Sequence, residues 1–137
     1  MDELLTNTRT VLEGGKPTSK VFSHSLAFNL IPFIDKLQPN GYSREEMKVA
    51  LETRKIFGLE EGDVRISCTA VRVPITRVHS EAITIETHSP IDPEHARKVL
   101  RSATGVELID DPADNIYPMP LSATGKQTVE VTYDPCR

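Results

Sequence analysis

Two strand patterns in the middle of the chain lie between helical patterns, and this order restricts the possible folds. In residues 64–73, and again in residues 81–87, apolar side chains alternate with polar ones, which is typical of a strand with one buried face. Shorter strand patterns follow at residues 106–109 and 128–133. Because helices and strands are interspersed, we expect an α+β fold in which an antiparallel or mixed sheet carries helices packed on one face.

Three helices are predicted around these strands. Residues 1–13 place apolar side chains on one stripe, and two glycines then end the helix. Ser43 and Glu46 form a capping-box pattern that opens a second helix, which a later glycine can close. Asp92 precedes a proline at the first helical position, and apolar residues then recur at helical spacing until Gly105.

The length and composition indicate one folded domain, residues 1–137. The chain is 38% hydrophobic and 26% charged, a balance that a disordered chain does not show. The apolar segment 21–42 is interrupted by prolines and a glycine, so we expect an extended run there, followed by a loop. Its apolar side chains are expected to line a core or an interface.

The charge pattern argues against two classes of partner. The net charge is −4, and the sequence has neither a cluster of Lys and Arg nor any tryptophan, so we expect no binding to nucleic acid or to an anionic membrane. No apolar run approaches the ~20 residues that span a membrane, and the N-terminus is acidic where a signal peptide would be basic. We therefore expect a cytoplasmic chain, or one inside an organelle such as a plastid.

Cysteine, histidine and glycine spacings predict no metal and no nucleotide site in this chain. Cys68 lies among apolar residues and is expected to be a small buried residue, whereas Cys136 is expected to be an exposed thiol near the end of the chain. No spacing pairs histidines with cysteines for zinc, and no Gly-x-Gly-x-x-Gly or Walker pattern occurs. We expect no catalytic role for three of the histidines: His24, His88 and His95.

Arg72 and His79 are the candidate functional residues of the two strand patterns. Since side chains alternate along a strand, Arg72 shares the face of Ile66, Cys68 and Ala70, and His79 shares the parity of Ile83 in the next pattern. Arg72 could bind a carboxylate with two hydrogen bonds, while His79 could transfer a proton near neutral pH. By pattern alone, the alternative also stands that Arg72 only reaches solvent and that His79 is a surface loop residue.

Glu52 and Lys55 belong to a charged face of the second predicted helix. Together with Glu45 and Lys48 they recur at spacings of three and four, which is the usual pattern of a solvated, ion-paired helix face. Periodicity by itself assigns these residues no other role.

Three motifs together are similar to one enzyme family. They are "LAFNLIPFID" (26–35), "EEMKVALETRKIFG" (45–58) and "CTAVRVPITRVHSEAITIE" (68–86). They resemble aspartate-semialdehyde dehydrogenase, specifically its catalytic and dimerisation domain, and "DNIYPMPLSATGK" (114–126) resembles the family's next segment. The motifs follow the family's order, and the resemblance covers about residues 1–131.

The resemblance implies an NADPH-dependent enzyme of amino-acid biosynthesis leading to lysine, threonine and methionine. Such an enzyme reductively dephosphorylates aspartyl phosphate to aspartate semialdehyde and phosphate through a cysteine thioester. By motif, His79 resembles the acid/base catalyst and Arg72 the group that binds the substrate carboxylate. Glu52 resembles the residue that binds the substrate amino group, and Lys55 the one that contacts phosphate. The implied fold is that of the C-terminal domain of glyceraldehyde-3-phosphate dehydrogenase-like enzymes, with a homodimer formed through the sheet face.

The chain also departs from the family's pattern. The family's nucleotide-binding domain and nucleophilic cysteine have no counterpart in it, so the resemblance implies an incomplete portion that is inactive alone, with NADP(H) bound by the complete enzyme. After Val131 the sequence leaves the pattern. Two alternatives remain: a free-standing, non-catalytic paralogue that acts as an interaction module, or a domain of a reductase for another acyl phosphate, such as N-acetylglutamyl phosphate. Glu52 favours the aspartate enzyme, because an acetylated substrate has no free ammonium group.

Overall fold

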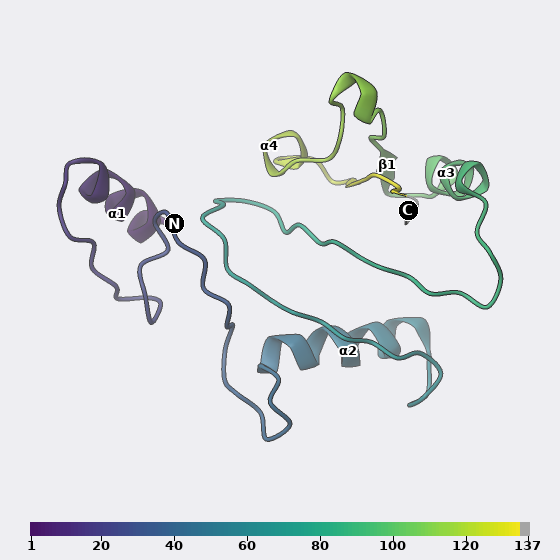
Figure 1. Ribbon diagram of the computed structural model, residues 1–137, viewed down its shortest axis with the longest axis horizontal. Helices are drawn as coiled ribbons and strands as arrows, with labels where there is room; N and C mark the ends of the chain where they lie inside the picture. The colour runs from purple at the N-terminus through teal and green to yellow at the C-terminus, as the bar shows by residue number, and fades with distance from the viewer. Residues whose placement is uncertain (135–137) are drawn as a thin grey trace. The chain divides into compact units, whose positions relative to one another are not determined.

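The computed structural model describes residues 1–134 and divides the chain into two compact units. The first unit, Met1–Pro74, contains helices α1 (Asp2–Leu12) and α2 (Arg44–Phe57) (Figure 1). The second unit, Ile75–Arg137, holds the remaining helices and the strands. No helix among residues 1–134 is long and apolar enough to cross a membrane.

Helix α1 confirms the first helix prediction, and polar side chains attach it to the loop that follows. Its predicted apolar stripe is only partly covered, since Leu12 is 72% exposed. Asn7, by contrast, is 3% exposed, and its side-chain amide both donates to and accepts from the backbone of Thr18. The Glu3 carboxylate accepts from the backbone N–H groups of Lys20 and Val21. A buried amide needs such partners, so these bonds determine the path of the loop.

Helix α2 forms as its capping pattern predicts. The Ser43 hydroxyl accepts from the Glu46 N–H at 3.3 Å, and the Glu46 carboxylate accepts from the Ser43 N–H at 2.7 Å. Gly58 ends the helix in the left-handed conformation, with φ of 64°, which costs glycine little because it has no Cβ.

The segment 64–72 runs along α2 and shows the predicted alternation of faces. Residues 66, 68, 70 and 72 are half-buried, whereas their neighbours are exposed. The Arg54 guanidinium donates to the Val64 carbonyl at 3.3 Å, and the Glu46 carboxylate accepts from the Ala70 N–H at 3.0 Å. These two bonds attach the segment near each end of the helix. Arg72 forms one antiparallel bridge, with Ile31.

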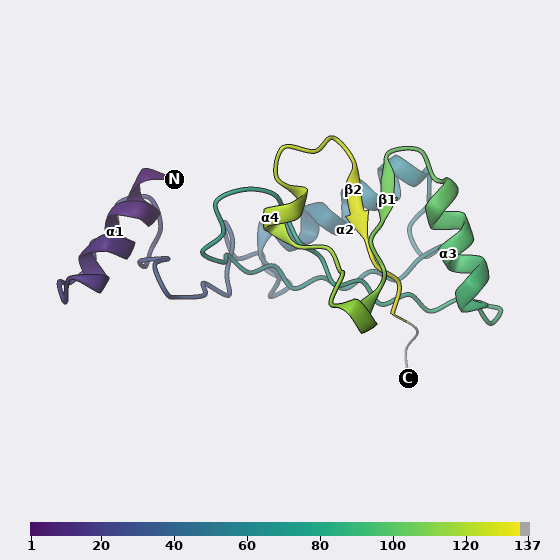
Figure 2. The ribbon, with the colours of Figure 1, turned by 90° about the horizontal axis from the view of Figure 1, so that it is seen from above.

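In the second unit a parallel pair of strands supports one amphipathic helix. Strands β1 (Val106–Leu108) and β2 (Val129–Val131) are paired, and helix α3 (Pro93–Ser102) packs against β1 (Figure 2). The connection between the strands contains the short 3-10 helix η1 (Pro112–Asp114) and the one-turn helix α4 (Pro120–Ala123), which the sequence did not predict. Parallel strands need such a long connection. Helices combined with a small sheet confirm the α+β class.

Two ion-pair networks hold this unit together. The Arg97 Nε donates to Asp110 at 2.6 Å, joining α3 to the end of β1, and the Thr132 hydroxyl donates to the same carboxylate at 2.7 Å. The bonds from Thr132 and Arg97 hold the pKa of Asp110 below its usual value. On the strands, the register pairs Glu107 with Glu130, and the Lys126 ammonium lies 3.0 and 2.6 Å from their carboxylates.

The prediction that residues 64–73 and 81–87 form strands is wrong. Within residues 1–134, neither residues 64–73 nor residues 81–87 belong to a strand, and antiparallel pairing is limited to isolated bridges such as Ile31–Arg72. A strand requires a neighbour that takes up its backbone hydrogen bonds, and alternation in the sequence does not supply one. The shorter predictions at residues 106–109 and 128–133 are confirmed by β1 and β2.

Candidate functional site

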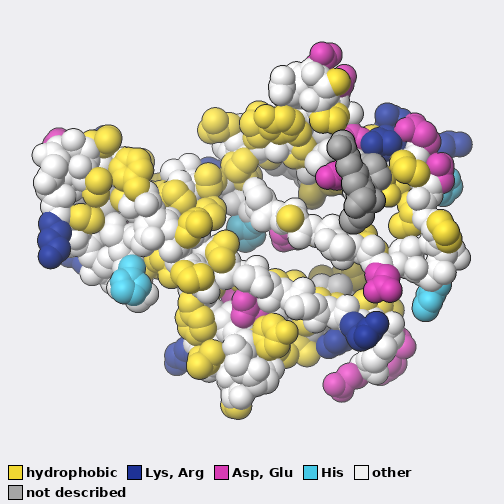
Figure 3. All heavy atoms as spheres, in the orientation of Figure 1, with side chains coloured by type: hydrophobic (Ala, Val, Ile, Leu, Met, Phe, Trp, Pro, Cys, Tyr) yellow, Lys and Arg dark blue, Asp and Glu magenta, His cyan; other side chains and the backbone are white. Residues whose placement is uncertain are grey.

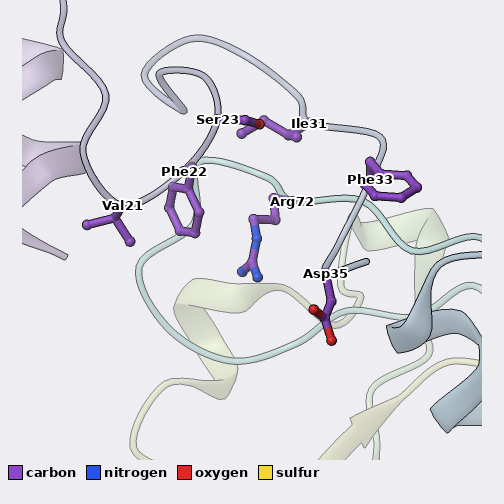
Figure 4. A pocket seen from close by; sticks show the side chains of 7 residues that line it. All are labelled: Val21, Phe22, Ser23, Ile31, Phe33, Asp35 and Arg72. Carbon is purple, nitrogen blue, oxygen red and sulfur yellow. The ribbon is translucent and has the colours of Figure 1, made fainter. Parts of the chain in front are cut away.

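Arg72 lines an open pocket of the first unit. Its side chain belongs to the half-buried row of the 64–72 segment, and its guanidinium carbon lies 4.6 Å from the centre of the Phe22 ring. Figure 4 shows the guanidinium beside this ring, with the Asp35 side chain entering the same pocket. The pocket is lined by Val21, Phe22, Ser23, Ile31, Phe33, Asp35 and Arg72.

The positive charge of Arg72 has no anionic partner inside the described chain. Among residues 1–134, no carboxylate forms an ion pair with it, and its guanidinium donates no hydrogen bond to another side chain or to the backbone. Asp35 is paired with Arg44 instead, at 3.7 Å. A guanidinium has five N–H donors in a planar fork that matches a carboxylate or a phosphate. The pocket can therefore receive an anion at Arg72.

Glu52 and Lys55 lie on the exposed side of α2. The predicted ion-paired face is present only in its first half, where Lys48 pairs with Glu45 at 3.3 Å. Glu52 and Lys55 form no ion pair with any other residue of the described chain. One carboxylate and one ammonium group are thus available on this helix for a ligand that carries both signs of charge.

Glu46 connects α2 to the backbone beside Arg72. It bonds the Ala70 N–H, two residues before Arg72, while it also completes the capping box at Ser43. Hydrogen bonds from the Ser43 and Ala70 backbones hold the pKa of Glu46 below its usual value. The capping pattern predicted the bond to Ser43, but nothing local in the sequence indicates the bond to Ala70.

His79 lies in the second unit, in a stretch where every residue from 73 to 92 is exposed. Its imidazole makes no hydrogen bond or ion pair with residues 1–134. The preceding residue, Val78, has φ of 62°, which is a rare and costly conformation for a β-branched side chain. The unusual backbone conformation of Val78 therefore lies directly before His79, the predicted proton-transfer residue. None of the four candidate residues bonds to another within the described chain.

Cys68 was expected to be buried but is only half-buried, on the same face as Ala70, and Cys136 lies outside the described residues. Within residues 1–134, no group of three or more His, Cys, Asp and Glu side chains could hold a metal ion. Phe22 was missed as a site residue, since the sequence marks it only as one apolar residue of an interrupted segment.

Comparison with known proteins gives this arrangement a context. The model of the semialdehyde dehydrogenase dimerisation domain matches residues 1–134. The chain belongs to this family. Among curated relatives, the aspartate-semialdehyde dehydrogenase of Synechocystis sp. is 44% identical over 131 residues, and that of Aquifex aeolicus is 42% identical over 132 residues. Each comparison covers 96% of this chain and 38% of the relative, so the dimerisation domain spans well under half the length of these proteins.

Solved structures agree with this assignment. Aspartate semialdehyde dehydrogenase II from Vibrio cholerae matches with a TM-score of 0.81 and 34% identity, covering 96% of this chain and 38% of that one. A second structure of that enzyme, complexed with ASA, matches with a TM-score of 0.80 over 94% of this chain and 37% of that one. The α+β arrangement of the present chain is therefore the arrangement of one part of those enzymes.

Proposed function

We propose that this chain is the substrate-binding and dimerisation domain of an NADP-dependent aspartate-semialdehyde dehydrogenase. The complete enzyme would reductively dephosphorylate aspartyl phosphate to aspartate semialdehyde and phosphate. The observation that carries the proposal is that Arg72 is half-buried, lines an open pocket and has a guanidinium without an anionic partner in residues 1–134. Family membership and the ASA complex of a relative support the same substrate class.

The candidate residues match the charges of this substrate. Aspartate semialdehyde carries a carboxylate and an ammonium group, and aspartyl phosphate adds a phosphoryl group. Arg72 would bind the carboxylate in a two-point contact, and Glu52 would bind the ammonium group. Lys55 would contact phosphate as a point charge, and His79 would transfer the proton, a role that imidazole side chains commonly take in enzymes.

The cofactor is proposed for the complete enzyme and not for this chain. NADPH would supply the hydride that reduces the acyl group. The sequence contains no glycine-rich turn of the dinucleotide-binding kind, and so its residues do not fit such a site. The contribution of this domain is to bind and orient the substrate and to move a proton.

The proposed partner is a second copy of the chain, which would pair through the face that carries Ile83 and Ile85. These side chains are 72% and 69% exposed, although they alternate with polar residues as a buried face would. The family model is that of a dimerisation domain, which favours a second copy as the cover. We place the protein in the cytoplasm or in an organelle interior, where this biosynthetic reaction would occur.

The decisive experiment replaces Arg72 by lysine in the complete enzyme. Lysine keeps the charge but loses the planar fork, so kcat/KM for aspartate semialdehyde should fall by about 10- to 100-fold. Arg65→Lys is the matched control, since Arg65 is an exposed residue on the opposite face of the same segment. Steady-state kinetics with NADP and phosphate would measure both variants. Values within twofold of the wild type for Arg72→Lys would remove Arg72 from the substrate site.

A further inference from the structure

We infer that Phe22 is a positioning residue, whose ring holds the Arg72 guanidinium in the orientation that receives the substrate carboxylate. This inference rests on the proposed role of Arg72. The ring centre lies 4.6 Å from the guanidinium carbon, which is within the range of a cation–π interaction. Among residues 1–134, this is the one interaction that the guanidinium makes with a charged, polar or aromatic group.

An aromatic ring suits this task because it does not compete with the substrate. The five N–H donors of a guanidinium lie in its plane, and a carboxylate partner within the protein would occupy them. The ring of Phe22 instead attracts the cation through its π-system. Arg72 is thereby restrained while its donors stay available. Asp35, the one acidic residue among those that line the pocket, is paired with Arg44, and so it leaves Arg72 available to an anion.

The loop that carries Phe22 is anchored on both sides of the ring. Before it, the Glu3 carboxylate accepts from the Lys20 and Val21 N–H groups at 2.9 and 3.0 Å. Beyond it, the Asn7 amide donates to the Ser25 hydroxyl at 3.3 Å. Helix α1 therefore sets the position of the ring.

The backbone of Arg72 is anchored independently. Its N–H donates to the Ile31 carbonyl at 2.9 Å, and its carbonyl accepts from the Ile31 N–H at 3.1 Å. Since the loop that carries the ring and the backbone of Arg72 are each held by hydrogen bonds, the approach of the ring to the guanidinium follows from the fold of the first unit. Loss of the ring would leave the backbone of Arg72 in place and release only its side chain, which can then adopt many rotamers.

The test compares Phe22→Leu with Phe22→Tyr in the complete enzyme. Leucine keeps an apolar side chain but removes the π-system, so we expect KM for aspartate semialdehyde to rise by about 3- to 20-fold, with a smaller change in kcat. Tyrosine keeps an aromatic face and should retain a KM within about twofold of the wild type. KM for phosphate and for NADP, and the melting temperature, should stay unchanged in both variants.

Two further variants separate positioning from general effects. Phe57→Leu, at an exposed site at the end of α2, should leave all kinetic constants unchanged. Phe33→Leu, in the same pocket as Arg72, should raise KM for aspartate semialdehyde by less than Phe22→Leu, because Phe33 does not lie over the guanidinium.

The possible outcomes are distinct. A normal KM in Phe22→Leu, beside a large loss in Arg72→Lys, would overturn the inference and leave the proposed function standing. The inference is also overturned if Phe22→Leu alters every KM and the melting temperature together, since that is a structural effect. If Arg72→Lys is itself silent, the substrate assignment fails. Selective loss in Phe22→Leu, rescued in Phe22→Tyr, would establish the positioning role.

Discussion

The segments 64–72 and 81–87 both alternate apolar and polar residues, yet they have different surroundings. The first lies along α2, where Glu46 and Arg54 hold its backbone and every second residue is half-buried. The second is exposed at every position. Within the described chain, the only hydrogen bond of residues 75–91 joins Thr87 to Ser89.

This difference shows what an alternating pattern means physically. The pattern indicates which side of a segment is stabilised by burial. The residues that bury this side must come from another part of the chain or from a partner. Figure 3 shows hydrophobic side chains spread over the face turned to the viewer. Ile83 and Ile85 belong to the large hydrophobic residues of the described chain that are strongly exposed. Helix α2 covers the 64–72 segment, and we propose that a second copy of the chain covers the 81–87 segment.

The largest expected effect is on dimerisation and comes from placing a charge on the exposed face that carries Ile83 and Ile85. In the complete enzyme, Ile83→Asp should weaken dimerisation by more than about a thousandfold, because an unpaired carboxylate would have to be buried at the interface. Sedimentation velocity over a range of protein concentrations would measure the change. Thr84→Asp, on the opposite face of the same segment, is the control and should remain dimeric. A dimer that survives Ile83→Asp would show that this face has some other cover.

A smaller effect is expected at the N-terminal cap of α2, which Ser43 forms with Glu46. Ser43 is 1% exposed, and its hydroxyl caps α2, so Ser43→Ala should lower stability by about 1 kcal/mol. Urea unfolding followed by circular dichroism would measure this loss. Ser67→Ala, at an exposed position of the 64–72 segment, should change stability by less than half as much. Equal losses in the two variants would contradict the assigned role of the cap.

The smallest effect concerns the pH dependence of the hydrogen bond by which Glu46 holds the Ala70 backbone. Because hydrogen bonds hold the pKa of Glu46 below its usual value of 4.5, this carboxylate contributes stability that is present above that value and is lost as the pH falls through the lowered pKa. Hydrogen exchange at the Ala70 amide, corrected for the intrinsic effect of pH, should therefore lose protection in acid. Glu46→Gln should weaken this dependence, whereas Glu45→Gln should preserve it. A wild-type profile in Glu46→Gln would rule out this source of the pH dependence.

Only part of the candidate site was predicted, because the sequence patterns report on neighbouring residues and not on contacts between distant ones. The parity of the 64–72 segment placed Arg72 on the half-buried face, and the structure confirms this. Its aromatic neighbour could not be predicted, since Phe22 belongs to an irregular loop whose path depends on bonds to Glu3 and Asn7. The strand predictions at residues 64–73 and 81–87 failed for a similar reason, because alternation lies within one segment whereas a ladder of hydrogen bonds needs a second one.

The sequence by itself determined the three longer helices, α1, α2 and α3, because the signals that start and end them act over a few residues. The Ser43–Glu46 box, Gly58 and the Asp92 cap all form bonds or conformations inside their own turns. Tertiary structure alone decided which distant groups meet: the Phe22 ring with Arg72, the Glu46 carboxylate with Ala70, and the Lys126 ammonium with Glu107 and Glu130. Such contacts depend on the path of the whole chain between the partners, and no local preference encodes that path.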